Sequence, residues 1–281
     1  MQEAAERWAV ADLTVGSAGD RRKGDTMNVT TVLGRFVEAL TEGDRQSCRA
    51  LIREMVDEGL PVRRLYDELL WPAMEQVAQL YKEDRIDAAA EHMATRIVRA
   101  VADQVQMHLA QRERNGQRIL ILCADGEPEE LGAQMCADLF EADGWETFFV
   151  GGGVPDDEVL TLVGRLGPDV LLIFGTQPAG VVPVRRLIHL IREVGAHPSM
   201  NILISGGVFN RAEGLWEEVH ADLFAPTVRE ALTLAEQAPP RVPQVCVPGA
   251  PKKRRRRRRP PLLAQAEAAG VLIGAGAGGG H

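Results

Sequence analysis

The chain has 281 residues, of which 45% are hydrophobic and 26% charged, so it can bury one large core or two modest ones. No apolar run approaches the roughly 18 residues that span a bilayer, and Glu6, Arg7 and Asp12 interrupt any signal-peptide pattern. The four cysteines lie far apart without a CxxC pair, which argues against a zinc site or a disulfide framework. These features predict a cytoplasmic protein without a membrane segment.

The net charge of -8 conceals an uneven distribution, because residues 252–259 are all Lys or Arg. Without these eight cations, 24 basic residues remain against 40 acidic ones, a balance of -16. Such an acidic body is poorly suited to a nucleic-acid backbone, so nucleic acid is expected only through the basic run. That run could also bind an anionic partner or the acidic body, or be a solvated extension.

The chain is expected to begin with a flexible arm at 1–27, followed by a helical domain at 28–114. Apolar residues recur there every three or four positions, which predicts a four-helix bundle. Asp44 and Asp87 stand where they can cap the second and fourth helices. Pro72 is expected to bend the third helix.

Beyond residue 115 the pattern predicts an α/β domain over 116–238. Strand-like runs, two of them continuously apolar, alternate with amphipathic helices, which is typical of strands buried on both faces. The expected fold is a flavodoxin-like (Rossmann-like) five-stranded parallel sheet, whose ligands lie beyond the carboxyl ends of the strands. The predicted strands are 118–124, 145–150, 169–175, 201–205 and 222–225, and the predicted helices are about 129–143, 155–166, 180–195, 211–219 and 227–237.

The final segment, 239–281, is Pro-rich, then Arg-rich, then Ala/Gly-rich. It cannot bury enough apolar surface to offset its chain entropy, and we expect it to be disordered.

The loop after the first predicted strand carries Glu127, Glu129 and Glu130 before Gly132. Its acidity and the absence of a GxGxxG spacing argue against a dinucleotide site. The carboxylates suit either a ligand site or an ordinary helix N-terminus, where they complement the helix dipole.

Two further strand-end loops contain small residues, Gly175-Thr176-Gln177 and Gly206-Gly207. A pair of glycines lets a flat ligand approach the backbone, and it equally suits a tight turn. In the helical domain, Tyr81 precedes the pair Glu91-His92 by ten residues. A histidine at such a position is either a partly exposed surface residue or a metal ligand with a neighbouring acceptor.

Together these motifs resemble the cobalamin (vitamin B12)-binding domain family, most closely its photoreceptor and regulator branch, in which a helical bundle precedes a flavodoxin-like domain. The resemblance covers about residues 28–238. Tyr81-x9-Glu91-His92 is similar to the family's W-x9-E-H motif, with tyrosine in place of tryptophan. The first loop overlays the acidic-x-His-x-x-Gly motif, with Glu129 at the histidine position. Gly206-Gly207 stands where the family has a glycine pair beside the buried nucleotide tail of the cofactor.

The resemblance implies a cofactor, adenosyl- or methylcobalamin, with haem or a bilin as alternatives. His92 is then expected to bind the metal and Tyr81 to cover the ring, while Glu129 replaces the family's lower-ligand histidine with a harder donor. The implied cofactor-binding residues are Tyr81, Glu91, His92, Glu127, Glu129, Gly132, Gly175, Thr176, Gln177, Gly206 and Gly207.

The function implied is a cobalamin-binding sensor or regulator, in one form light-responsive, that acts through a separate partner such as a transcriptional repressor or signalling protein. We do not expect an enzyme, because the strand-end loops contain no nucleophile–base pair or paired catalytic carboxylates. Two alternatives stay open: a corrinoid protein component of a methyltransferase system, and a cofactor-free adaptor that keeps the fold. The oligomeric state is not predicted.

Overall fold

The computed structural model describes residues 29–124 and 130–243. The arm expected at 1–27 and the tail from residue 244 lie outside these ranges. The disorder expected from residue 239 begins too early, because Asn201 donates a 3.0 Å hydrogen bond to the Pro239 carbonyl and Arg241 donates one of 3.1 Å to Asp222. These contacts fasten residues 239–241 to the α/β domain.

The helical domain consists of four helical rods, as predicted. They are α2 (Val29–Glu42), α3 (Arg45–Asp57), a continuous rod made of α4 (Val62–Leu65), η1 (Tyr66–Leu70) and α5 (Trp71–Lys82), and α6 (Ala88–Val105), which a short 3-10 turn, η2 (Gln106–His108), extends. Asp44 accepts hydrogen bonds from the backbone N–H groups of Gln46 and Ser47 at the start of α3, and Asp87 accepts one from Ala90 in α6. Both predicted caps are therefore confirmed.

The third rod accommodates Pro72 through a wider turn. Residues 66–70 form a π-helical segment, in which the Trp71 N–H donates to the Tyr66 carbonyl five residues earlier. A proline has no N–H and its ring crowds the preceding turn, so a π segment relieves the clash without ending the helix. The expected disturbance at Pro72 thus takes this form.

The α/β domain contains one parallel five-stranded sheet in the order β2-β1-β3-β4-β5, which confirms the flavodoxin-like prediction. Its strands are β1 (Arg118–Cys123), β2 (Glu146–Gly151), β3 (Val170–Phe174), β4 (Asn201–Ser205) and β5 (Leu223–Ala225). The last residues of four strands are in register, since Cys123 pairs with Phe174, Phe174 with Ser205, and Ser205 with Ala225. The carboxyl ends of these strands therefore form one level edge.

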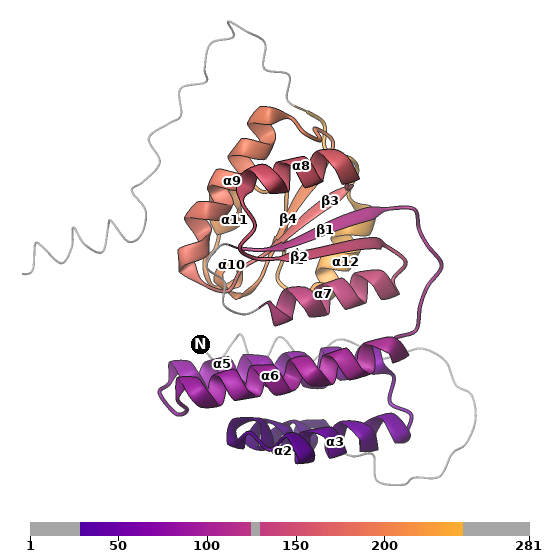
Figure 1. The fold of residues 1–281 in the computed structure, drawn as a ribbon, viewed down its shortest axis with the longest axis vertical. Helices are drawn as coiled ribbons and strands as arrows, with labels where there is room; N and C mark the ends of the chain where they lie inside the picture. Colours follow the sequence, from indigo (N-terminus) through magenta and orange to yellow (C-terminus); the bar gives the residue numbers. More distant parts are fainter. Residues whose placement is uncertain (1–28, 125–129, 244–281) are drawn as a thin grey trace, which may run out of the picture. The chain divides into compact units, whose positions relative to one another are not determined.

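Helices cover both faces of the sheet: α7 and α12 lie on one face, and α8 and α9 on the other (Figure 1). Their bounds are α7 (Leu131–Ala142), α8 (Asp156–Leu166), η3 (Pro178–Gly180), α9 (Val181–Val194), α10 (Gly207–Arg211), α11 (Leu215–Glu218) and α12 (Val228–Gln237). The single helix expected at 211–219 is wrong. Two short helices replace it, because Gly214 between them has a left-handed backbone with φ +75°.

The sheet separates two hydrophobic cores. Alternate residues of β1 divide between them: Ile119 and Ile121 join the core that includes the helical domain, α7 and α12, whereas Leu120 and Leu122 join the core under α8 and α9. The helical domain and one face of the sheet therefore share a single core. None of the described helices combines the length and the apolarity needed to cross a membrane.

Candidate functional site

The third helical rod runs along α7 in the opposite direction. At its start, Arg63 donates two hydrogen bonds of 2.9 and 2.8 Å to the Asp143 carboxylate just beyond the end of α7. One turn later, the Tyr66 hydroxyl donates to Asp138 at 2.8 Å and lies 3.3 Å from the Ala102 carbonyl of α6. These contacts fix the direction of both α5 and α6 relative to the sheet.

The rod reaches the carboxyl edge of the sheet at Trp71. The Trp71 ring meets the ring of Phe174, the last residue of β3, edge to face, with centroids 6.2 Å apart. From there α5 continues to Lys82, which at 1.5 Å per residue carries it about 16 Å past the strand end. The end of α5 lies near Arg211, the last residue of α10 at the sheet edge. Partial burial and this neighbouring guanidinium both lower the pKa of Lys82.

The helical hairpin of α5 and α6 therefore projects beyond the sheet, and we call residues 75–95 the overhang. Three residues predicted for the site lie in it. Tyr81 is 46% exposed. The His92 imidazole is 61% exposed, and its Nε2 lies 3.7 Å from the Glu91 carboxylate, which is mostly buried. The structure thus brings Glu91 and His92 together and leaves the aromatic ring of Tyr81 and the imidazole accessible.

The predicted residues of the two glycine-containing loops also lie together. The Gly175 N–H donates to the Ser205 carbonyl at 3.0 Å, and Arg211 donates to the Thr176 carbonyl at 2.8 Å. Gly206 has φ +105°, and a Cβ there would lie 2.3 Å from the Gly175 carbonyl oxygen. Only glycine fits this close approach of the two loops. Gln177 next to them is exposed.

The first loop is described only at its two ends, so Glu127 and Glu129 lie outside the described residues. Glu130 does not cap α7 as a helix N-terminus would predict. Its carboxylate accepts the Gly152 N–H at 2.7 Å, across the sheet edge. A Cβ on Gly151 would lie 2.4 Å from the same oxygen. The glycine run at 151–153 was the sequence signal for this contact, which the sequence analysis missed.

Gly132, the last predicted residue of the first loop, faces a filled space. A Cβ there would lie 2.5 Å from Cζ of Phe174, whose side chain is buried. The glycine therefore makes room for a phenylalanine ring of the same chain. Sequence analysis missed Phe174 as a site residue, because an apolar residue that ends a buried strand has no distinctive signal.

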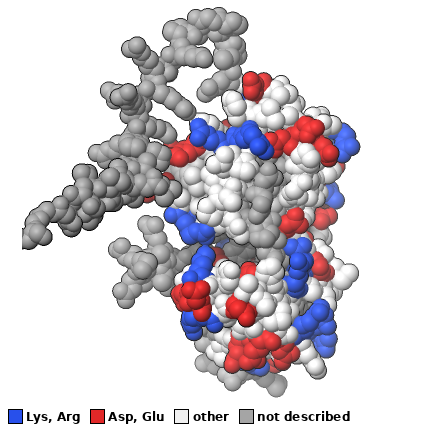
Figure 2. Space-filling model, turned by 60° about the vertical axis from the view of Figure 1, so that its left-hand side comes forward, with Lys and Arg blue, Asp and Glu red and all other residues white. Residues whose placement is uncertain are grey.

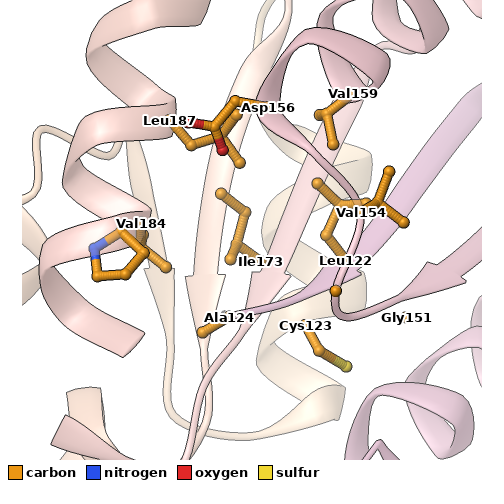
Figure 3. A pocket seen from close by; sticks show the side chains of 12 residues that line it. Leu122, Cys123, Ala124, Gly151, Val154, Asp156, Val159, Ile173, Val184 and Leu187 are labelled. Atoms are coloured by element: carbon orange, nitrogen blue, oxygen red, sulfur yellow. The ribbon is translucent and has the colours of Figure 1, made fainter. Parts of the chain in front are cut away.

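On the opposite face of the strand ends there is a small cavity of about 20 Å³. Leu122, Val154, Val159 and Ile173 point into it, and Asp156 stands at its margin (Figure 3). Its volume suits about one water molecule, whereas small-molecule sites measure roughly 300–1,000 Å³. The cavity is too small for a cofactor.

The electrostatics of this side of the molecule are mixed. On the side that carries the strand ends, basic and acidic side chains occur in separate small groups with uncharged surface between them (Figure 2). In the described part of the chain, no three His, Cys, Asp or Glu residues cluster in a way that could hold a metal ion. Among the described residues, His92 is therefore not part of such a cluster.

Among the carboxyl groups of the domain contact, Asp138 has the most strongly shifted pKa. Burial raises the pKa of its carboxyl to about 6, Asp103 and Glu141 add to the rise, and the hydrogen bond from Tyr66 opposes it. Burial beside the same carboxyl raises the pKa of the Tyr66 phenol. These groups lie in the interface of α7 with the helical domain, and they bear on the docking of the two domains.

Two family models, each describing a B12 binding domain, match residues 32–106 and 117–235. Together they span about two thirds of the chain, the first over the helical domain and the second over the α/β domain. The helical domain and the flavodoxin-like sheet thus together form a B12-binding type of module. The chain belongs to the B12-binding domain family, as the sequence motifs indicated, and this membership lends no support to the haem or bilin alternatives.

The fold is shared by the first of the following solved structures, and the other two are more distantly similar. A monomethylamine corrinoid protein from Methanosarcina barkeri has a TM-score of 0.67 at 16% identity, over 73% of this chain and 97% of that one. A cobalamin-binding protein from Desulfitobacterium hafniense DCB-2 has a TM-score of 0.41 at 17% identity, over 73% and 97%. A methanol:cobalamin methyltransferase complex from Methanosarcina barkeri has a TM-score of 0.41 at 16% identity, over 83% and 91%. No curated protein matches the chain.

Proposed function

We propose that this protein is a corrinoid carrier that holds a cobalamin-type ring between the overhang and the sheet edge and presents it to a separate methyltransferase. The observation that carries the proposal is the overhang itself. It projects Tyr81 and His92 past the carboxyl edge of a parallel sheet, where ligands of this fold lie. Membership of the B12-binding family supports the same ligand class.

The residues around this space suit a flat macrocycle. At the sheet edge, Gly207 is partly exposed and carries no side chain that would hold a ring away, while Gly175 and Gly206 are buried in the contact of the two loops. In the overhang, the exposed Tyr81 can cover an apolar ring face. The exposed His92 imidazole can donate a nitrogen to a metal, with Glu91 as the acceptor that orients it. A bound corrinoid would supply a cobalt that carries an alkyl group.

In this proposal the protein binds and orients the cofactor, and the transfer chemistry belongs to the partner. The fold likeness to a corrinoid protein supports this carrier over the light-responsive regulator expected from the sequence. In this proposal a methyltransferase takes the place of the repressor or signalling protein that the sequence led us to expect as the partner. The loop carboxylate Glu129, in place of the family's histidine, is expected to weaken coordination from the lower face.

A cofactor-free adaptor is the second candidate, and the observation that favours it is the filled space at Gly132. The two candidates differ in a direct way. A carrier must retain a corrinoid through gel filtration, whereas an adaptor must not.

The test is reconstitution with hydroxocobalamin, followed by absorption spectra of the protein fraction. We expect retention of the pigment, with a visible band that shifts in the His92→Ala variant. The matched control is His189→Ala on α9, because the His189 imidazole is also exposed and its Nε2 lies 3.6 Å from the Glu193 carboxylate. Identical spectra for the wild type and both variants would show that His92 does not coordinate the cobalt. If no pigment is retained by the protein, the adaptor is favoured.

A further inference from the structure

Within residues 29–124 and 130–243, neither face of the sheet edge shows a space that suits the nucleotide tail of a complete cobamide. On the face of α8 and α9, the cavity measures about 20 Å³. On the face of α7 and α12, the slot beside Gly132 holds the Phe174 ring. A nucleotide needs a pocket of several hundred Å³, as ligands of that size do in general.

The Phe174 ring is held in this slot from several sides. Gly132 receives it so closely that a Cβ would lie 2.5 Å from Cζ. The Trp71 ring closes the slot from the helical domain at a centroid distance of 6.2 Å and 88° between planes. The Trp71 indole N–H in turn donates to Glu75 at 3.2 Å, within α5. The Phe174 ring is therefore packed like the ring of a core residue and does not border an empty pocket.

A second ring closes the neighbouring position. A Cβ on Gly175 would lie 3.1 Å from Cε2 of Phe209 and 3.3 Å from Cβ of Ala124. Phe209 is buried at the start of the segment after Gly206-Gly207. Phe174 and Phe209 thus fill the strand ends of β3 and β4 on opposite faces of the sheet, Phe174 in the core that includes α7 and α12 and Phe209 in the core under α8 and α9.

We infer that this protein recognises the corrin ring and not the nucleotide, so that a corrinoid lacking the nucleotide binds as well as a complete cobamide. Phe174 is the residue that determines this specificity, because its ring, packed between Gly132 and Trp71, fills the end of β3 at the strand edge where ligands of this fold lie. The inference rests on the proposed corrinoid-binding function. It names the ligand class as corrin rings irrespective of their lower base.

The test compares hydroxocobalamin with aquocobinamide, which has the same ring without the nucleotide, by quenching of tryptophan fluorescence or calorimetry on the full chain. We expect the two dissociation constants to agree within about threefold, a free-energy difference below that of a tenfold change. A preference of about tenfold or more for hydroxocobalamin would overturn the inference. Binding of neither ligand would instead overturn the proposed function.

Variants at the slot sharpen the comparison. Phe174→Ala opens the space beside Gly132 and is expected to raise the preference for hydroxocobalamin over aquocobinamide at least about fivefold. Phe224→Ala is the matched control, because Phe224 stacks on Trp216 in the core under α8 and α9, at a centroid distance of 6.3 Å. Its preference should stay that of the wild type.

Thermal unfolding must show that both variants are folded. If Phe174→Ala is not, Phe174→Leu opens part of the slot and serves in its place, with a smaller rise in preference expected. A folded slot variant whose preference equals that of Phe224→Ala would contradict the role of Phe174.

Discussion

The Tyr66 hydroxyl donates a 2.8 Å hydrogen bond to the Asp138 carboxylate, and this bond joins the π segment of the third rod to the middle of α7. Both groups are removed from water, and their charged forms are disfavoured there. The contact between the helical domain and the sheet domain therefore contains an acid that titrates close to neutral pH.

Asp138 makes stability depend on pH in a defined window. Its pKa is about 6 in the folded protein against an ordinary value of 3.8, so the folded state binds this proton more tightly. The associated stabilisation is complete below about pH 4 and is lost as pH rises to about 6. After allowance for solvent screening it amounts to about 1–2 kcal/mol. Urea unfolding across this window should show the loss in the wild type and not in Asp138→Asn. Equal pH profiles would contradict the assignment.

The close approach of the two glycine loops predicts a severe effect of Gly206→Ala. The left-handed backbone and the contact with the Gly175 carbonyl should cost about 3 kcal/mol or more of unfolding free energy. Gly164→Ala is the control, because Gly164 lies exposed in α8 with nothing near its Cβ position. It should raise stability by about 0.5–1 kcal/mol. Thermal and urea unfolding measure both, and a similar small effect of the two substitutions would refute the constraint.

Two adjacent arginines should differ in their contribution. Arg63 forms a two-bond pair with Asp143, whose side chain is only 12% exposed, across the domain contact. Arg64 pairs with Glu68 on the exposed face of the same rod. We expect Arg63→Ala to cost about 1–2 kcal/mol and Arg64→Ala less than about 0.5 kcal/mol. Chemical denaturation measures the loss of unfolding free energy in each variant. A larger loss in Arg64→Ala than in Arg63→Ala would show that the pair with Asp143 does not fasten the domains.

A carrier and a light-responsive regulator predict different behaviour of the protein loaded with methylcobalamin. For a carrier, illumination should remove the methyl group without a change in oligomeric state, because the partner and not the bundle responds to the cofactor. Gel filtration with light scattering, in the dark and after illumination, makes the comparison. A change in the molar mass of the protein after illumination would instead support the light-responsive regulator.

The elements that the sequence predicted well are those with a local cause. The run Val170–Phe174 is apolar throughout because both faces of β3 are buried, and the caps at Asp44 and Asp87 depend only on neighbouring N–H groups. The helix expected at 211–219 failed where a local signal, Gly214, competed with the apolar pattern.

The site depended on contacts distant in sequence, which no local pattern encodes. Glu130 had the composition of a helix cap, yet it binds Gly152 of another loop. Phe174 ended an apolar run like any core residue, and only its contact with Gly132 and Trp71 shows that it fills the slot at the sheet edge. Tyr81 and His92 were predicted because their spacing resembles a known motif, and the overhang that exposes them follows from the packing of the third rod on α7.

The measurement that tests the central claim most directly is equilibrium dialysis of the purified full-length protein against hydroxocobalamin. The account predicts saturable binding of one corrinoid per chain, weakened by a Tyr81→Ala substitution in the overhang and unchanged by His189→Ala on α9. If the chamber with protein retained no more hydroxocobalamin than a chamber without protein at every concentration, the account would be contradicted.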